Sequence, residues 1–200
     1  DLPSLVSPTL KWERIQTLDI GGDFGFFNNE LNISFDWYQR TTKDMLAPGQ
    51  TMPDVLGAGA PKINAGTLRT RGWELSIDWR HHFNEVNVYA NASIGDFKTV
   101  ITKWDNDSQL LNENYSGKVY GDIWGFETDR YFTKDDFNAD GSYKEGIASQ
   151  KKLEQDGFVY GPGDIKFKDL NNDKEINGGE GTVKDHGDLK VIGNTTPRYQ

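Results

Sequence analysis

The feature that most constrains this chain is a strict alternation of apolar and polar residues in four long segments. In residues 31–38 every second residue is apolar, namely Leu31, Ile33, Phe35 and Trp37. The same period of two recurs in residues 73–80 and 86–94, and residues 18–26 follow it at their apolar positions. Successive side chains of a β-strand point to opposite faces, so each segment is predicted to be a strand with one apolar face.

The connections between these segments are of two kinds. Asn28-Asn29 and Asn84-Glu85 predict tight hairpins, because asparagine tolerates the positive φ that such turns require. Long loops are predicted at residues 47–70, which are rich in Gly, Pro and Ala, and at residues 105–185, which are polar. Short turns at one end and long loops at the other are typical of transmembrane β-barrels. The predicted strands cover about residues 11–27, 31–46, 71–83 and 86–104.

The composition is compatible with membrane strands. The mean hydropathy is −0.72 and only 35% of residues are hydrophobic, so a soluble core built from this chain would be thin. No segment approaches the roughly 20 apolar residues of a membrane helix, whereas a membrane strand needs only about 9 to 11 residues. The alternative is a soluble, calcium-stabilised β-sandwich that binds glycans, since sandwich strands also alternate. Sandwich strands are shorter, however, at about 5 or 6 residues.

Several classes of function are excluded or disfavoured. The chain has no Cys, which excludes disulfides, thiolate metal sites and cysteine nucleophiles. Its net charge of −9 disfavours nucleic-acid binding, which needs clustered Lys and Arg. His81 and His82 are adjacent on a predicted strand, so they point to opposite faces and cannot chelate one ion together. No catalytic constellation is evident, and we do not expect an enzyme.

A set of short motifs resembles, in order, the SusC/RagA family of TonB-dependent outer-membrane transporters. Two of them are Arg71-Gly72-Trp73-Glu74-Leu75 and Gly121-Asp122-Ile123-Trp124-Gly125-Phe126. Each motif is weak alone, but the ordered set covers nearly the whole chain. The others lie at residues 12–13, 19–29, 36–38, 42–46, 64–66, 162–167 and 191–199.

The resemblance implies an all-β fold of antiparallel strands forming part of a 22-stranded barrel in the bacterial outer membrane. It implies a partial barrel from the C-terminal side, without the plug domain. Family members in Bacteroidetes import oligosaccharides or peptides. The expected partners are therefore a SusD-like lipoprotein, the rest of the barrel and the plug, TonB acting through the plug, outer-membrane lipid, and an oligosaccharide or peptide ligand.

Residues 169–180 match the twelve-residue calcium loop, in which oxygen-bearing residues alternate along a tight turn. Lys174 stands where the pattern has glycine, so the turn would force this residue toward positive φ. The alternative is an acidic surface turn without an ion. The predicted ligands of a structural Ca²⁺ are Asp169, Asn171, Asp173, Glu175, Asn177 and Glu180.

Aromatic residues are frequent in the second long loop. Their rings could stack on sugars or contact a partner protein, or they could pack the loop against itself. The predicted contact residues are Tyr120, Trp124, Phe126 and Tyr131.

Overall fold

A computed structural model describes residues 7–48, 61–106 and 108–199, which fall into two compact units. The sheet unit contains the described residues up to Asp105, together with Tyr115–Tyr120 and the residues from Thr196 onward. The loop unit contains Asn106–Asn114 and Gly121–Thr195. Each unit is described by itself.

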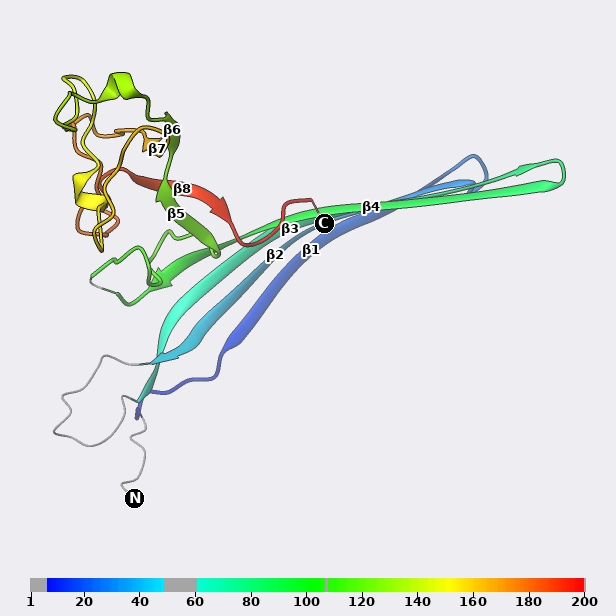
Figure 1. Ribbon diagram of the computed structural model, residues 1–200. Helices are drawn as coiled ribbons and strands as arrows, with labels where there is room; N and C mark the ends of the chain where they lie inside the picture. The colour runs from blue at the N-terminus through cyan, green and yellow to red at the C-terminus, as the bar shows by residue number, and fades with distance from the viewer. Residues whose placement is uncertain (1–6, 49–60, 107, 200) are drawn as a thin grey trace. The chain divides into compact units, whose positions relative to one another are not determined.

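The sheet unit is a single antiparallel sheet of four long strands (Figure 1). The strands pair in the order β1-β2-β3-β4, so each is hydrogen-bonded to its neighbour in sequence. This arrangement confirms the predicted all-β, antiparallel fold class. The strands are β1 (Arg14–Phe26), β2 (Leu31–Pro48), β3 (Lys62–Phe83) and β4 (Val86–Trp104).

Both predicted hairpins are present at one end of the sheet (Figure 1). Phe27, Asn28 and Asn29 have φ values of 55°, 55° and 66° in the turn between β1 and β2. Asn84 has a φ of 49° in the turn between β3 and β4. These are the left-handed conformations that asparagine tolerates better than most residues, which is why the two turns were visible in the sequence.

The loop predicted at residues 47–70 extends too far, because its last residues belong to a strand. β3 begins at Lys62 instead of residue 71, and β2 continues to Pro48. In this region polar residues occupy both faces, for example Arg69 and Thr70 on β3, so no apolar alternation marks the strand. Backbone hydrogen bonds to β2 hold it nonetheless, with register shifts near Met45. Residues 49–60 of the predicted loop lie outside the described residues.

The register of the strands separates the side chains of the sheet into an apolar and a polar face. Residues opposite one another in an antiparallel pair lie on the same face. One such row is Phe24, Ile33, Ile77 and Ala92. The apolar band, as we call it here, contains Leu18, Ile20, Phe24, Phe26, Leu31, Ile33, Phe35, Trp37, Trp73, Leu75, Ile77, Trp79, Phe83, Val86, Val88, Ala90, Ala92 and Ile94.

The apolar band is uncovered within the sheet unit. Ile20 is 61% exposed, Phe24 is 56% exposed and Val86 is 60% exposed. The buried apolar residues of the sheet unit, Ala65, Ile101 and Tyr115, all lie outside the band. A soluble β-sandwich buries such a face against a second sheet, and no second sheet covers the band within the described sheet unit.

The loop unit contains short strands that the sequence did not reveal. It occupies most of the predicted loop at residues 105–185, but two small antiparallel sheets form it, β5 with β8 and β6 with β7. No helix of the described residues is long and apolar enough to cross a membrane. The elements are β5 (Asp122–Phe126), β6 (Thr128–Tyr131), the 3₁₀ turns η2 (Lys134–Asp136) and η3 (Lys151–Leu153), β7 (Ile165–Phe167) and β8 (Leu189–Asn194).

Buried polar side chains hold the loop unit together. Gln150 is fully buried, where its amide donates to the Ile165 carbonyl and accepts from the Phe167 N–H. Asp188 is also fully buried and accepts hydrogen bonds from the N–H groups of Leu170 and Asn177. Because these groups satisfy backbone donors and acceptors, the unit needs only a few apolar residues at its centre.

Candidate functional site

The polar face of the sheet carries a shallow hollow of about 650 Å³. Three cross-strand rows form it, and the central row runs from Asp19 through Tyr38 and Gly72 to Phe97. All of its lining residues lie on this one face. They are Thr17, Asp19, Asp36, Tyr38, Arg40, Thr70, Glu74, Phe97 and Thr99.

Gly72 makes room for the Tyr38 ring in the floor of the hollow. A Cβ atom at Gly72 would lie 2.5 Å from the Tyr38 ring and 2.9 Å from the Cβ of Phe97. The absence of a side chain at Gly72 therefore allows the Tyr38 ring and the Cβ of Phe97 to lie close to the backbone of β3. In the next row toward the loops, the hydroxyls of Thr70 and Thr99 are 2.8 Å apart.

The hollow is rich in carboxylates. Asp36 and Glu74 lie directly opposite each other on β2 and β3, and Asp19 lies on the neighbouring strand. Arg40 is the basic residue of the lining. Among the described residues no group of three or more His, Asp or Glu side chains is placed to hold a metal ion. Hydroxyl, carboxylate and aromatic groups on one open surface suit a hydrated polar ligand better than an ion.

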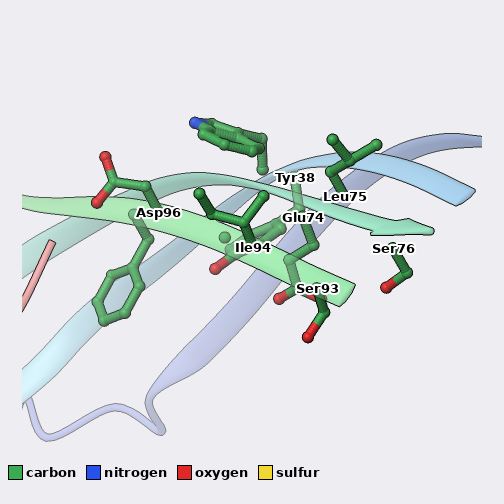
Figure 2. Close-up of a pocket in the computed structure, with 10 residues that line it drawn as sticks. Tyr38, Glu74, Leu75, Ser76, Ser93, Ile94 and Asp96 are labelled. Atoms are coloured by element: carbon green, nitrogen blue, oxygen red, sulfur yellow. The ribbon is translucent and has the colours of Figure 1, made fainter. Parts of the chain in front are cut away.

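A second hollow, of about 240 Å³, lies between β3 and β4. Figure 2 shows Leu75 and Asp96 on one side of the sheet and Ser76 and Ser93 on the other. The lining residues come from both faces of the sheet, so this hollow is not a pocket on a single face. We therefore base the candidate site on the larger hollow, whose residues share the polar face.

The predicted calcium residues form a tight, internally hydrogen-bonded turn. Lys174 has a φ of 67°, the positive value that its place in the loop pattern predicts. The side-chain oxygens of Asn171 and Asp173 accept hydrogen bonds from backbone N–H groups two residues further on. The Glu175 carboxylate lies 2.5 Å from the Lys152 ammonium. One oxygen of Asp169 accepts from the Lys174 N–H, while its second oxygen is buried without a partner.

Asn177 belongs to the same hydrogen-bonded turn, because its side-chain amide donates to the Glu175 carbonyl. The Asn177 side chain accepts from the Gly179 N–H, and Glu180 is exposed. The loop keeps the sequence pattern, but most of its predicted ligand residues accept hydrogen bonds from its own backbone N–H groups through a side-chain oxygen. Calcium binding therefore stays a prediction.

The four predicted contact aromatics are divided between the two units. Tyr120 belongs to the sheet unit and the other three belong to the loop unit. Within the loop unit, Trp124 lies beside His186 at 5.4 Å and Phe126 beside Phe167 at 5.4 Å between ring centres. Tyr131 is 68% exposed. Trp124 and Phe126 thus pack the loop unit against itself, which was the alternative considered for them, and partner contact by the set stays a prediction.

Comparison with known proteins identifies the family. Residues 2–182 match the family described as TonB dependent receptor-like, beta-barrel. The chain belongs to this family. Among curated relatives, TonB-dependent receptor P3 of Formosa agariphila is 29% identical, over 99% of this chain and 19% of that protein. TonB-dependent receptor SusC of Bacteroides thetaiotaomicron is 33% identical, over 38% of this chain and 8% of that protein.

Solved structures agree with the family assignment. The structure of the RagAB peptide transporter matches 70% of this chain and 17% of its own chain, with 26% identity and a TM-score of 0.54. The RagAB peptide importer in its open-open state matches 73% of this chain and 17% of its own, with 25% identity and a TM-score of 0.55. These matches confirm the resemblance to the SusC/RagA transporters. The chain spans about a fifth of the length of the curated relatives that match nearly all of it.

In this TonB-dependent receptor segment, the hollow on the polar face was missed by sequence reasoning. The alternation placed Asp36 and Tyr38 on the polar face of one strand, but it did not show which residues of β3 would lie opposite them. Extending the polar positions Ser76 and Glu74 back by the same period of two to Gly72 and Thr70 would have found the β3 contribution.

We expect calcium to protect residues 169–180 of the receptor from proteolysis if the loop binds the ion. Substituting Asp169→Asn and Asp173→Asn together should abolish this protection, because both would lose a charged ligand. Cleavage within the loop, measured with calcium and with a chelator, tests the prediction. Asp140→Asn is the control, since Asp140 caps a similar turn through the Ser142 N–H outside the loop. Equal cleavage of the unsubstituted protein in both conditions would rule out the ion.

We expect the loop unit to lose stability in acid, because the Glu127 carboxylate becomes protonated. The Glu127 carboxylate accepts hydrogen bonds from the Lys168 and Lys190 ammonium groups at 2.8 and 2.5 Å. These contacts, with that from Lys168 the larger, lower the pKa of Glu127 from 4.5 to about 2. A depressed pKa stabilises the folded state above the unfolded value, and this stability is lost as pH falls from about 4.5 toward 2.

Hydrogen exchange of the β8 amides between about pH 5 and pH 3 measures this effect. Exchange corrected for its intrinsic rate should accelerate toward pH 3 in the unsubstituted receptor. In Glu127→Gln it should already be faster at pH 5 and should change less with pH. Glu145→Gln provides the control, because Glu145 is exposed and has no ion pair among the described residues. If the β8 amides are equally protected from hydrogen exchange in Glu127→Gln and in Glu145→Gln, the prediction is wrong.

Proposed function

We propose that this chain forms part of the wall of a TonB-dependent transporter in the bacterial outer membrane. The observation that carries this proposal is the division of one long sheet into an uncovered apolar face and a polar face with a hollow. Facing lipid on one side and an aqueous interior on the other is the arrangement that a barrel wall requires.

The length of the apolar band supports the proposal. On β3 the band runs from Trp73 to Phe83, which matches the roughly 9 to 11 residues that a tilted strand needs to cross the hydrocarbon layer. Trp37 and Trp73 lie opposite each other at the end nearer the loops, and Trp79 and Phe83 lie near the hairpins. Aromatic side chains at both ends of an apolar band are typical of membrane interfaces.

The polar face supports a role in transport of a hydrated nutrient. Carboxylates, hydroxyls and the rings of Tyr38 and Phe97 could contact an oligosaccharide or a peptide as it passes the wall. We propose one of these two classes as the ligand, a SusD-like lipoprotein as the extracellular partner, and TonB as the energy source through a plug domain. The likeness to SusC and to the RagAB peptide importer supports these choices. We propose transport and not catalysis as the role of this segment.

Cysteine labelling tests the orientation of the two faces. The chain contains no Cys, so single cysteines report only the positions chosen. In the transporter that carries these strands, Ser34→Cys and Asp36→Cys should react with a water-soluble maleimide. Ile33→Cys and Phe35→Cys should react poorly with that reagent and well with a lipid-soluble one. The predicted signature is an alternation with a period of two along β2.

Two results would contradict the proposal. Uniform labelling of all four positions by the water-soluble reagent would mean that both faces meet water. Recovery of the protein from cells without detergent, in the soluble fraction, would mean that the apolar band is covered by protein and not by lipid.

A further inference from the structure

Charge is divided between the two faces of the sheet in a way that the membrane role alone does not require. The polar face carries acidic residues on β1, β2 and β3, although the chain as a whole already has a net charge of −9. The apolar face, beyond the band and away from the hairpins, is mainly basic, although it also carries Asp96. The acidic residues are Asp19, Asp23, Asp36, Glu74 and Asp78, and the basic residues are Arg14, Lys43, Arg69, Arg71 and Lys98.

Three of these basic residues, which we call the basic belt, lie immediately beyond the apolar band. Arg71 and Lys98 are directly opposite each other on β3 and β4, one row past Trp73. Arg69 lies one row further, on the same face. At about 3.4 Å per residue, the Cα atoms of Arg71 and Arg69 are roughly 7 and 14 Å beyond that of Trp73 along the strand. Tryptophan marks the edge of the hydrocarbon layer, so the belt lies at the depth of lipid headgroups.

The basic belt has no protein counter-charge among the described residues. Arg71 donates its Nε–H to the neutral Gln39 side chain at 2.7 Å. Arg69 and Lys98 form no ion pair within the described part of the chain. The nearest acidic residue on this face in the adjacent row, Asp96, is 2.5 Å from the Arg198 guanidinium. Like charges directly opposite each other are destabilising, so Arg71 and Lys98 would gain from a shared anion.

We propose that Arg69, Arg71 and Lys98 bind the phosphate-bearing headgroup of a membrane lipid whose acyl chains lie on the apolar band. The guanidinium groups can donate paired hydrogen bonds to phosphate oxygens, and Lys98 adds a third positive charge. The apolar band begins one row away, so a lipid satisfies both the cations and the uncovered apolar surface, whereas a free anion satisfies only the cations. The proposal rests on the lipid-facing orientation proposed above.

The test compares charge removal on the two faces. The purified transporter in mild detergent is titrated with phosphatidic acid and with phosphatidylcholine of the same acyl chains, and bound lipids are counted by native mass spectrometry. The unsubstituted protein should prefer phosphatidic acid. In Arg71→Gln with Lys98→Gln, binding of phosphatidic acid should weaken by about 25-fold, at roughly fivefold per basic residue. Arg40→Gln with Arg80→Gln removes two charges from the polar face and should leave binding unchanged.

Controls separate lipid binding from folding and from the proposed function. Arg71→Lys with Lys98→Arg keeps both charges and should retain the preference, which shows that any loss reflects charge and not assembly. Equal loss in the two neutralised pairs, or no preference for phosphatidic acid, would overturn the proposal. Displacement of the lipid by an equal concentration of inorganic phosphate would also overturn it. If β2 labelling still alternates in these cases, the basic belt alone is wrong and the wall orientation stands.

Discussion

Substituting Ala92→Arg should destabilise the folded transporter in a bilayer by about 2 to 4 kcal/mol. Ala92 lies on the apolar face in the row of Phe24, Ile33 and Ile77, near the middle of the apolar band. The residue is exposed and small, so the substitution removes little packing. Its cost is therefore mainly that of placing a guanidinium group in hydrocarbon. Urea unfolding from lipid vesicles measures the change in the free energy of unfolding.

The neighbouring residue is the matched control for this prediction. Ser93 follows Ala92 on β4, is also exposed, and lies on the polar face opposite Ser76. Ser93→Arg should change the free energy of unfolding by less than about 1 kcal/mol, because the new charge faces water. Ala92→Leu should be neutral or stabilising, since it adds apolar surface to the same position. A similar penalty for arginine at 92 and at 93 would contradict the division into two faces.

Substituting Gly187→Ala should destabilise the loop unit by about 3 kcal/mol. Gly187 has a φ of 53°, and a Cβ atom there would lie 2.3 Å from the Asn177 carbonyl oxygen and 2.6 Å from the Gly179 nitrogen. The left-handed conformation costs a non-glycine residue about 1 to 2 kcal/mol, and overpacking against backbone adds about 1 to 3 kcal/mol. Because both contacts are to backbone, a side-chain rotation cannot relieve them.

The effect of Gly187→Ala should extend to the buried carboxylate beside it. Asp188 holds the Leu170 and Asn177 N–H groups, so displacement of residue 187 should open this part of the loop unit. Hydrogen exchange of residues 169–190 in the intact transporter is the measurement. Gly181→Ala is the control, because Gly181 has a similar φ of 67° but nothing within 4 Å of a Cβ atom. It should cost only the strain of the backbone conformation, about 1 kcal/mol. Equal protection in the two variants would refute the role of the close contact.

The two faces of the sheet and its two hairpins were predictable from sequence because their signals are local. A period of two in residues such as Leu31 to Trp37 assigns a face without knowledge of the neighbouring strand. Asparagine at positions 28, 29 and 84 marks turns through its own backbone preference. The family resemblance came from motifs spread along the chain, and the comparisons confirmed it.

The tertiary structure decided the features that depend on pairing between distant residues. β3 starts at Lys62, where polar residues on both faces are held by backbone hydrogen bonds that leave no pattern in the sequence. The hollow and the basic belt arise because the register sets Tyr38 beside Gly72 and Arg71 opposite Lys98. In the loop unit, burial of Gln150 and Asp188 depends on backbone groups far along the chain. Alternation determines which side of a strand a residue occupies, but only the register between strands determines which residues it meets.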